Sequence, residues 1–450
     1  MFLILLVVGL FWCSLTVAFL AWEKLVYAML VFLSFSGAIE LWLPHIVWTR
    51  ELTDIFFVIP IYISLAFSGR WCDFKLPRFY GYSLLLLAAL VCVQMLNPSG
   101  PSWLARLVGF KVWLFYIPML WVGGVMADKS QIMLRVLLLS AWIPCLVGIL
   151  QWILVLRIGY QPAISMFYGA AGRHATQLYT GFNLGHGKIV RIPSTFSFVS
   201  EYYLYLICAL VISWLVAHGD VSYQWRRFAG LTQILIVIAS LLSGARAAFL
   251  FVPVMYLIYY VLNRQWKRFI WAFGFGISLA VTLFSFAHLQ ISRVAGLTYQ
   301  LTVRYSQVNG VSYISRFFSW LGHGVGSGTN AVRHVAHLHV APENFYAKAG
   351  YELGWLGIPV LLVVLSVPLA YFYRKYIINN VYNMRSEYIP MIILTIMLIV
   401  YSLKSPLLDY EPMNMLYWVS IGLYIFDENK AVKNLSYNLT DDKKHYYKIA

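Results

Sequence analysis

A repeated pattern of long apolar runs is the feature that most constrains how this chain can fold. About thirteen runs of roughly 17 to 25 residues follow one another, at residues 1–21, 25–43, 52–68, 80–96, 109–126, 132–156, 200–217, 229–243, 246–262, 269–287, 351–372, 389–403 and 412–426. A helix of about 20 apolar residues crosses a hydrocarbon core and satisfies its own backbone hydrogen bonds there. The pattern predicts an all-α polytopic membrane protein with about 12–13 transmembrane helices.

The composition agrees with this class and argues against a nucleic-acid-binding protein. Hydrophobic residues make up 61% of the chain and charged residues 11%, whereas soluble domains carry about 25% charge. The net charge of +16 is spread through short loops between the apolar runs, which is the positive-inside bias of membrane proteins. Four of the five cysteines lie inside apolar runs, so no disulfide framework is expected.

Two long polar intervals, 157–199 and 288–350, divide the chain. Basic residues at 70–78, 226–227, 264–268 and 374–385 mark short cytoplasmic loops, and counting runs between them places both long intervals on the outer face. We expect short interfacial helices in these outer loops, although a loop packed on its own aromatic residues fits 292–321 equally well. The predicted divisions are 1–156 (N-terminal helices), 157–199 (first outer loop), 200–287 (central helices with a turn at Arg246), 288–350 (large outer loop), 351–426 (C-terminal helices) and 427–450 (cytoplasmic tail).

Arginines on the predicted outer side need an explanation, because the positive-inside bias disfavours them there. Arg246 follows Ser243-Gly244, which resembles a turn and N-cap, so we expect it in the first turn of a helix. A cation beside exposed backbone N–H groups suits a phosphate, although an arginine reaching toward lipid headgroups is the alternative. Arg191 precedes the run at 200–217 and has a similar alternative as an interfacial anchor, while Glu201 complements the dipole of the helix that follows.

The interval 288–350 holds the candidates for acid–base chemistry. Pro342 predicts a helix start that would place Glu343 in the first turn, and Asn344 and Glu352 are each spaced four residues from Lys348. Histidines at 334, 337 and 339 lack the spacing of a helical zinc site and an acidic neighbour, so a general base is favoured over a metal ligand. The glycine-rich stretch 322–328 follows no strand and predicts a flexible turn, not a nucleotide fingerprint.

Three motifs in order resemble the Wzy/WaaL superfamily of bacterial O-antigen polymerases and ligases. Arg191-Ile-Pro-Ser-Thr-Phe is similar to its Arg-x-x-Gly-Thr-Phe entry, with Ser194 in place of glycine, and Ser243-Gly-Ala-Arg246-Ala-Ala is similar to its arginine-bearing helix start. The glycine run followed by Glu343-Asn344-Phe-Tyr and Glu352-Leu-Gly-Trp-Leu-Gly resembles the closing motif. The resemblance covers roughly residues 190–360.

The resemblance implies metal-independent, inverting glycosyl transfer from a polyprenyl-diphosphate-linked glycan at the outer face of the bacterial cytoplasmic membrane, with no cofactor. It implies that Arg191, Arg246 and Arg316 hold the diphosphate and that a base deprotonates the acceptor. Glu343 is the first candidate for this base and His339 the second, with His337 nearby. Supporting roles fall to Glu201, Asn344 and Arg333. Ligases carry a histidine-asparagine pair where this chain has Glu343-Asn344, which favours a polymerase over a ligase that transfers glycan to lipid A core or protein.

The expected partners are lipid-linked glycan donor and acceptor and membrane lipid, with a chain-length regulator protein and a flippase as further partners and no nucleic acid. The main alternative function is a lipid-linked glycan flippase or a small-solute transporter, for which Glu40, an acid inside the run 25–43, is the best candidate residue. Polar residues concentrate outside the runs, and this favours surface chemistry.

Overall fold

A computed structural model describes residues 2–42, 51–176, 182–183, 188–189, 191–267, 270, 274, 314, 318–329, 342, 344–381, 387–405 and 407–426. Six of its helical stretches are long and apolar enough to cross a membrane: Val7–Phe32, Arg78–Met95, Trp103–Ile158, Val199–Gly219, Tyr223–Leu242 and Gly357–Ile378. Shorter apolar helices cover Asp54–Ser68, Ala247–Leu262 and Tyr388–Tyr401. These helices support the prediction of an all-α multi-pass membrane protein.

The first half of the chain contains long helices interrupted by short turns of other helix types. They are α1 (Phe2–Phe32), α2 (Ser36–Trp42), the π-helix η2 (Asp54–Val58), α3 (Ile59–Ser68), the 3-10 helix η3 (Arg70–Asp73), α4 (Arg78–Met95), α5 (Trp103–Phe110), the π-helix η4 (Lys111–Phe115), α6 (Met119–Met126), η5 (Ala127–Lys129), α7 (Ser130–Ser140), α8 (Trp142–Ile158) and α9 (Tyr160–Thr176).

A kink at Ala21 divides α1 into two helices, because its φ of −152° and ψ of 54° are not helical. The kink coincides with the predicted boundary between the runs 1–21 and 25–43. The second run is less regular than predicted, since its helix ends at Phe32 and is followed by a turn at 33–35 and by α2. Glu40 lies on α2, is half-buried, and lies outside the stretches that are long and apolar enough to cross a membrane.

The second half begins with a short antiparallel pair, β1 (Phe182–Asn183) and β2 (Lys188–Ile189), with Phe182 opposite Ile189. The helices that follow are α10 (Val199–Gly219), α11 (Tyr223–Leu242), α12 (Arg246–Leu262), α17 (Phe345–Glu352), α18 (Gly357–Val381), α19 (Tyr388–Tyr401), the 3-10 turn η8 (Leu407–Asp409) and α20 (Glu411–Ile425). Residues Tyr202 to Val216 of α10 are all buried, so this helix is the centre of the bundle. A helix that is apolar on every side requires neighbours all round it.

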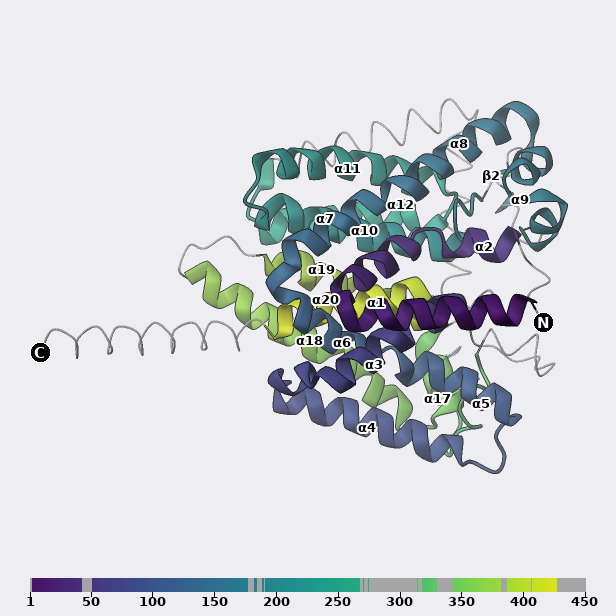
Figure 1. Ribbon diagram of the computed structural model, residues 1–450. Helices are drawn as coiled ribbons and strands as arrows, with labels where there is room; N and C mark the ends of the chain where they lie inside the picture. Colours follow the sequence, from purple (N-terminus) through teal and green to yellow (C-terminus); the bar gives the residue numbers. More distant parts are fainter. Residues whose placement is uncertain are drawn as a thin grey trace, which may run out of the picture.

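The helices run roughly parallel to one axis, which gives the bundle two ends (Figure 1). At the end on the right of Figure 1, which we call the loop end, lie α2, α5, α9, β2 and α17. Residues 191–198 and 318–329, which belong to the two long polar intervals, lie there with the connection 402–411. At the opposite end, which we call the pocket end, α10 ends at Gly219, α11 begins at Tyr223 and α12 ends at Leu262.

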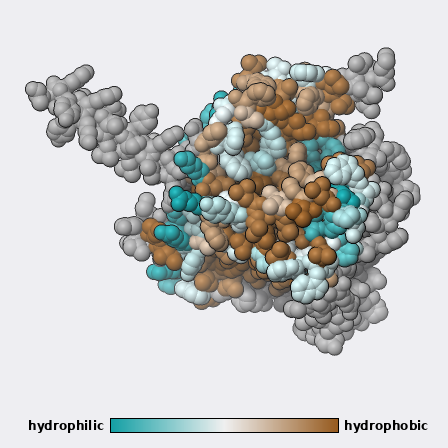
Figure 2. Space-filling model, turned by 90° about the horizontal axis from the view of Figure 1, so that it is seen from below, coloured by the Kyte–Doolittle hydropathy of each residue, from teal (hydrophilic) through white to brown (hydrophobic). Residues whose placement is uncertain are grey.

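The outer surface of the bundle is apolar along the middle of the helices. Helix α4 exposes a row of large side chains, including Phe79, Tyr82, Leu85, Leu86 and Val93. Figure 2 shows this class of residue gathered over the centre of one face, with hydrophilic residues toward its left and right edges. Exposure of this kind is stable in lipid and costly in water.

All five cysteines are free.

Candidate functional site

Two arginine-bearing segments that are far apart in the sequence meet at the loop end. The backbone N–H of Ile192 donates a hydrogen bond of 3.0 Å to the carbonyl oxygen of Ser243. Arg191 precedes the donor, and Arg246, the first residue of α12, follows the acceptor by three positions. The structure therefore brings the Arg191 and Arg246 segments together, as the candidate site requires.

The backbone at Ser194 has an unusual conformation. Its φ is +55°, in the left-handed region that glycine adopts without strain. The amide side chain of Gln151 fixes this turn by accepting from Ser194 N–H at 3.0 Å and donating to Ser194 O at 3.2 Å. The Ser194 hydroxyl donates to Pro144 O at 2.5 Å, and Thr195 Oγ1 donates to Ser34 O at 2.5 Å. These bonds hold the segment that carries Arg191 in one shape.

The guanidinium group of Arg191 retains unused hydrogen-bonding capacity. The residue is half-buried, and its Nε is buried with no hydrogen-bond partner among the described residues. A buried donor without a partner is costly, so an anionic ligand is one way to satisfy it. The predicted turn before Arg246 is confirmed, with Gly244 at φ +71°. Ser243 Oγ accepts from Ala245 N–H at 3.2 Å, and the N-cap residue is Ala245.

Glu201 lies in the first turn of α10, where it complements the helix dipole as expected. Its Oε2 accepts a hydrogen bond of 2.9 Å from the Ser197 hydroxyl. Tyr410, which precedes α20, is close enough for Glu201 to act on it electrostatically. Burial first, and the charge of Glu201 in addition, raise the pKa of Tyr410 to about 12. The phenol, which is protonated at neutral pH even at its ordinary pKa of about 10, stays protonated there.

Asp409, the residue before Tyr410, forms a buried ion pair with Lys348 of α17. Lys348 Nζ lies 2.5 Å from Asp409 Oδ1, and the two side chains are 0% and 5% exposed. The Lys348 ammonium also lies 5.7 Å from the centre of the Trp113 ring. Lys348 therefore pairs with Asp409, which precedes α20. The four-residue spacing in the sequence had suggested that Lys348 pairs with Asn344 or Glu352 along α17.

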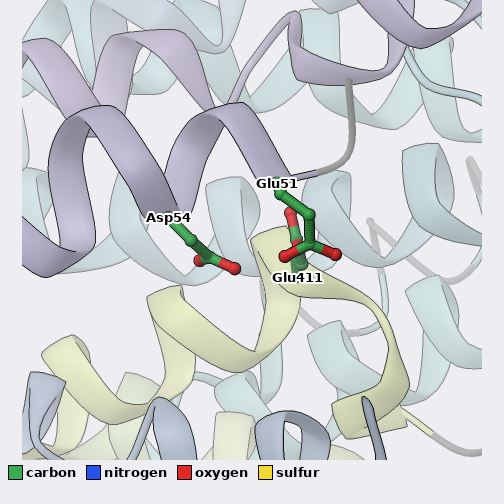
Figure 3. Close-up of side chains that lie close together, drawn as sticks. All are labelled: Glu51, Asp54 and Glu411. Atoms are coloured by element: carbon green, nitrogen blue, oxygen red, sulfur yellow. The ribbon is translucent and has the colours of Figure 1, made fainter. Parts of the chain in front are cut away.

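Glu411, the residue after Tyr410, belongs to a cluster of three carboxylates around Lys111. Lys111 Nζ lies 2.7 Å from Glu51, 2.6 Å from Asp54 and 2.5 Å from Glu411. The Tyr116 hydroxyl donates to Asp54 and to Glu411, each at 3.0 Å. Figure 3 shows the three acidic side chains converging from α20 and from the start of η2.

The carboxylate cluster has the donor atoms of a hard-cation site, but its charge is already partly balanced. One oxygen from each of the three carboxylates lies within 4.8 Å of the others, a spacing that a metal ion could bridge. The Lys111 ammonium lies within 2.7 Å of an oxygen of each and supplies the positive charge that such an ion would otherwise bring. With all groups ionised the cluster has a net charge of −2, which a shared proton would reduce.

The glycine run 322–328 forms a turn that packs against α4 and α5. It was predicted to be a flexible turn, but these contacts constrain its backbone. Gly322, Gly324 and Gly326 have φ of +78°, +85° and +89°. A Cβ on Gly326 would lie 2.1 Å from Ala105 O. Glu352 anchors the end of the run. Its Oε1 accepts from Gly328 N–H at 2.8 Å and from the hydroxyl of residue 329 at 3.0 Å.

Asn344 is the N-cap of α17. Its Oδ1 accepts from Tyr346 N–H and Ala347 N–H at 2.9 and 3.1 Å, and its Nδ2 donates to Leu403 O at 2.9 Å. These bonds fix the start of α17 to the end of α19. The helix begins at Phe345, so the prediction of a helix start at Pro342 with Glu343 in its first turn is wrong.

Several predicted site residues lie outside the described part of the chain. They are the base candidates Glu343, His339 and His337, the diphosphate candidate Arg316 and the supporting residue Arg333; for Arg246 the backbone alone is described. The segment 292–321, predicted to be interfacial, is described only at residue 314 and from residue 318 onward.

Sequence reasoning missed the buried charges at Lys111, Asp54 and the segment Asp409–Glu411. A signal was present, because Asp54 and Lys111 are opposite charges inside predicted spans 52–68 and 109–126. Charges inside apolar runs normally have partners. What the sequence could not supply is the pairing, since Lys111 and Glu411 are 300 positions apart.

Comparisons with known proteins do not identify the chain. No family model matches it, and no curated protein matches it. The functional assignment therefore depends on the residues and on the geometry at the loop end.

Proposed function

We propose that this protein is a polysaccharide polymerase that joins polyprenyl-diphosphate-linked oligosaccharide repeat units by inverting glycosyl transfer without a metal. The observation that carries the proposal is the hydrogen bond between Ile192 and Ser243, because it joins the segments of Arg191 and Arg246. The proposed reaction takes place at the outer face of the bacterial cytoplasmic membrane.

The chemistry of the leaving group explains why two arginine segments would meet. As the glycosidic bond to the diphosphate breaks, negative charge grows on the diphosphate oxygens. Guanidinium groups bind such oxygens through paired, charge-assisted hydrogen bonds. The Nε of Arg191, which has no hydrogen-bond partner among the described residues, is suited to this role, and Arg246 and Arg316 are the proposed companions.

The conformation of Ser194 adds independent support. The superfamily pattern has glycine where this chain has Ser194, and a positive φ is the conformation for which glycine is preferred. Ser194 adopts φ +55° and is held there by Gln151 and Pro144. The serine therefore keeps the shape that the pattern's glycine would give, which supports the resemblance at this motif.

The acceptor hydroxyl requires a base, for which Glu343 is proposed first and His339 second, with His337 nearby. Glu343-Asn344 stands where ligases of the superfamily have histidine-asparagine, so polymerisation is proposed over transfer to lipid A core or protein. The proposed partners are the lipid-linked donor and acceptor, a chain-length regulator and a flippase.

The test uses purified protein in vesicles with short lipid-linked repeat units and follows product length. Arg191→Ala and Arg246→Ala are each expected to reduce chain extension at least about 100-fold. Arg374→Ala is the matched control, because Arg374 is an exposed arginine on α18. All three variants should enter the membrane and elute as folded protein.

Normal extension by both loop-end variants would refute the proposal. Substrate left unextended by the wild type, but moved across the bilayer, would favour the flippase alternative. Product found on a terminal acceptor and not on the lipid carrier would favour a ligase.

A further inference from the structure

The pocket end contains a cavity that the proposed function does not use. Its volume is about 410 Å³, and it lies between α10, α11 and α12, within the size range of small-molecule sites. One wall is aromatic: the rings of Trp214 and Tyr259 are stacked with centroids 4.6 Å apart, and Tyr256 meets Trp214 edge-on at 5.2 Å. Such a wall packs well against hydrocarbon.

Apart from Ala217 and Gly230, the remaining lining is polar, and none of the described lining residues is acidic. His218, Gln233, Asn263 and Gln265 contribute to it. His218 Nδ1 lies 2.8 Å from Trp214 O, and a carbonyl oxygen only accepts, so Nδ1 carries the hydrogen. In the neutral imidazole, Nε2 then accepts from the Tyr259 hydroxyl at 2.8 Å. Asn263 Nδ2 already donates to Tyr259 O at 2.9 Å, and the second hydrogen of that amide, like the amide hydrogens of Gln233, can donate to an anion.

A guanidinium group lies one helical turn from this cavity. Arg226, Gly230 and Gln233 are spaced i, i+4 and i+7 on α11, which places them on one helix face. Arg226 is half-buried, and its Nε is buried without a hydrogen-bond partner among the described residues.

Asp220, the acid nearest to Arg226 in sequence, lies within electrostatic range of it, but its oxygens accept hydrogen bonds from other donors. Arg135 Nε and Nη2 donate to its two oxygens at 2.7 Å each, and Ser222 N–H also donates to Asp220 at 2.8 Å.

Further positive charge continues from the cavity into the turn after α12. Gln265 lines both the cavity and a neighbouring surface depression formed with Arg264, Trp266 and Lys267. Arg264 has a φ of +55°, a conformation that non-glycine residues adopt only when the surroundings impose it. Trp266 is 55% exposed, as a side chain at a membrane interface can be.

We propose that the cavity binds the phosphate headgroup of an anionic phospholipid. The guanidinium of Arg226 and the amides of Gln233, Asn263 and Gln265 hold the phosphodiester, and the wall of Trp214, Tyr256 and Tyr259 packs against the glycerol and the first methylenes of an acyl chain. Basic pockets between membrane helices are suited to anionic headgroups. The site is at the opposite end of the bundle from Arg191 and Arg246, so it does not depend on the proposed polymerase activity.

The chain offers a variant that fills the cavity without disturbing the fold. A Cβ on Gly230 would meet no atom within 4 Å, and Gly230 lines the cavity. Gly230→Leu therefore extends into open space and replaces a poor helix former with a good one. Arg226→Gln removes the charge and keeps the length of most of the side chain. Arg227→Gln is the matched control, because Arg227 is the exposed neighbour on another face of α11.

The experiment titrates the detergent-purified full chain with phosphatidylglycerol and counts bound lipid by native mass spectrometry. Phosphatidylcholine and inorganic phosphate are the comparison ligands. Phosphatidylglycerol is expected to bind at least about tenfold more tightly than either, and Gly230→Leu and Arg226→Gln should each weaken its binding at least about tenfold. Arg227→Gln should stay within about twofold of the wild type.

Three outcomes would overturn the proposal. Equal binding of phosphatidylcholine would show that the anionic headgroup is not recognised, and equal binding of inorganic phosphate would show that no lipid is needed. Wild-type affinity in the folded Gly230→Leu variant would place the lipid elsewhere. Because polymer formation is measured separately, failure here leaves the polymerase proposal untouched.

Discussion

The two ends of the bundle hold their charges in different ways. At the loop end, Lys348 and Asp409 form an ion pair with side chains 0% and 5% exposed. At the pocket end, Arg135 pairs with Asp220 through two bonds, and the side chains are 27% and 2% exposed, so that only the arginine reaches water. Removing one partner from a buried pair leaves a charge without solvation, whereas water can solvate an exposed partner. The same chemistry should therefore contribute a rigid framework at one end and little stability at the other.

The largest effect is expected from breaking the buried pair. Lys348→Met leaves the Asp409 carboxylate buried without its cation and should lower the free energy of unfolding by about 4 kcal/mol. The measurement is thermal or detergent-induced unfolding of the purified protein. A Lys348→Met, Asp409→Leu double variant should recover most of the loss, because no unpaired charge remains. A single variant as stable as the wild type would remove the distinction between the two ends.

A pair of glycine substitutions sharpens the comparison through backbone packing. Gly326→Ala at the loop end combines a φ of +89° with a Cβ 2.1 Å from Ala105 O, so it should destabilise by about 3 kcal/mol. Gly230→Ala at the pocket end enters open space within α11 and should stabilise by about 1 kcal/mol. Melting temperatures that move in the same direction for both variants would contradict the packing described here.

A smaller effect is expected at the carboxylate that anchors the glycine run. Glu352 accepts hydrogen bonds from Gly328 N–H and, at 2.7 Å, from Trp113 Nε1. Glu352→Gln directs an NH₂ group at one of these donors and should cost about 2 kcal/mol. Hydrogen exchange should rise selectively at residues 322–328, while exchange in α10 stays unchanged. Uniform protection in both segments would show that Glu352 does not anchor the run.

The smallest effect is expected from the pair of Arg135 and Asp220, of which the arginine is partly exposed. Hydrogen bonds from Arg135 hold the pKa of Asp220 below its usual value. Its stabilisation is therefore present above the ordinary aspartate pKa of about 3.9 and is lost as the pH falls through the lowered value. Asp220→Asn should cost about 1 kcal/mol at pH 7, and the difference from the wild type should vanish in the acid range. A loss as large as that of Lys348→Met would mean that exposure does not govern these pairs.

The sequence predicted the class of fold well and its boundaries poorly. Long apolar runs specify helices in lipid whatever their neighbours are, so the runs at 80–96 and 200–217 correspond closely to α4 and α10. The predicted boundary between 1–21 and 25–43 coincides with the kink at Ala21, but the interruption between Phe32 and Ser36 inside the second run was not predicted. Hydrophobicity does not encode where a helix kinks when no proline marks the position.

The candidate site was predictable in its residue types but not in its connections. The turn at Ser243-Gly244 and the helix start at Arg246 were predicted, but the N-cap residue is Ala245, which makes no side-chain capping hydrogen bond. The left-handed conformation of Ser194 was not predicted, because it is imposed by Gln151 and Pro144 from α8. A serine in isolation disfavours that conformation, and only the hydrogen bonds around it make it stable.

By itself, the sequence determined that this chain is a bundle of apolar helices, because each run meets its hydrogen-bonding and hydrophobic needs locally. It also singled out Arg191 and Arg246 as charges that need an explanation in such a bundle. The tertiary structure alone decided which of them meet, because a charge in a low-dielectric interior is stable only beside a partner, and that partner can come from any distance along the chain.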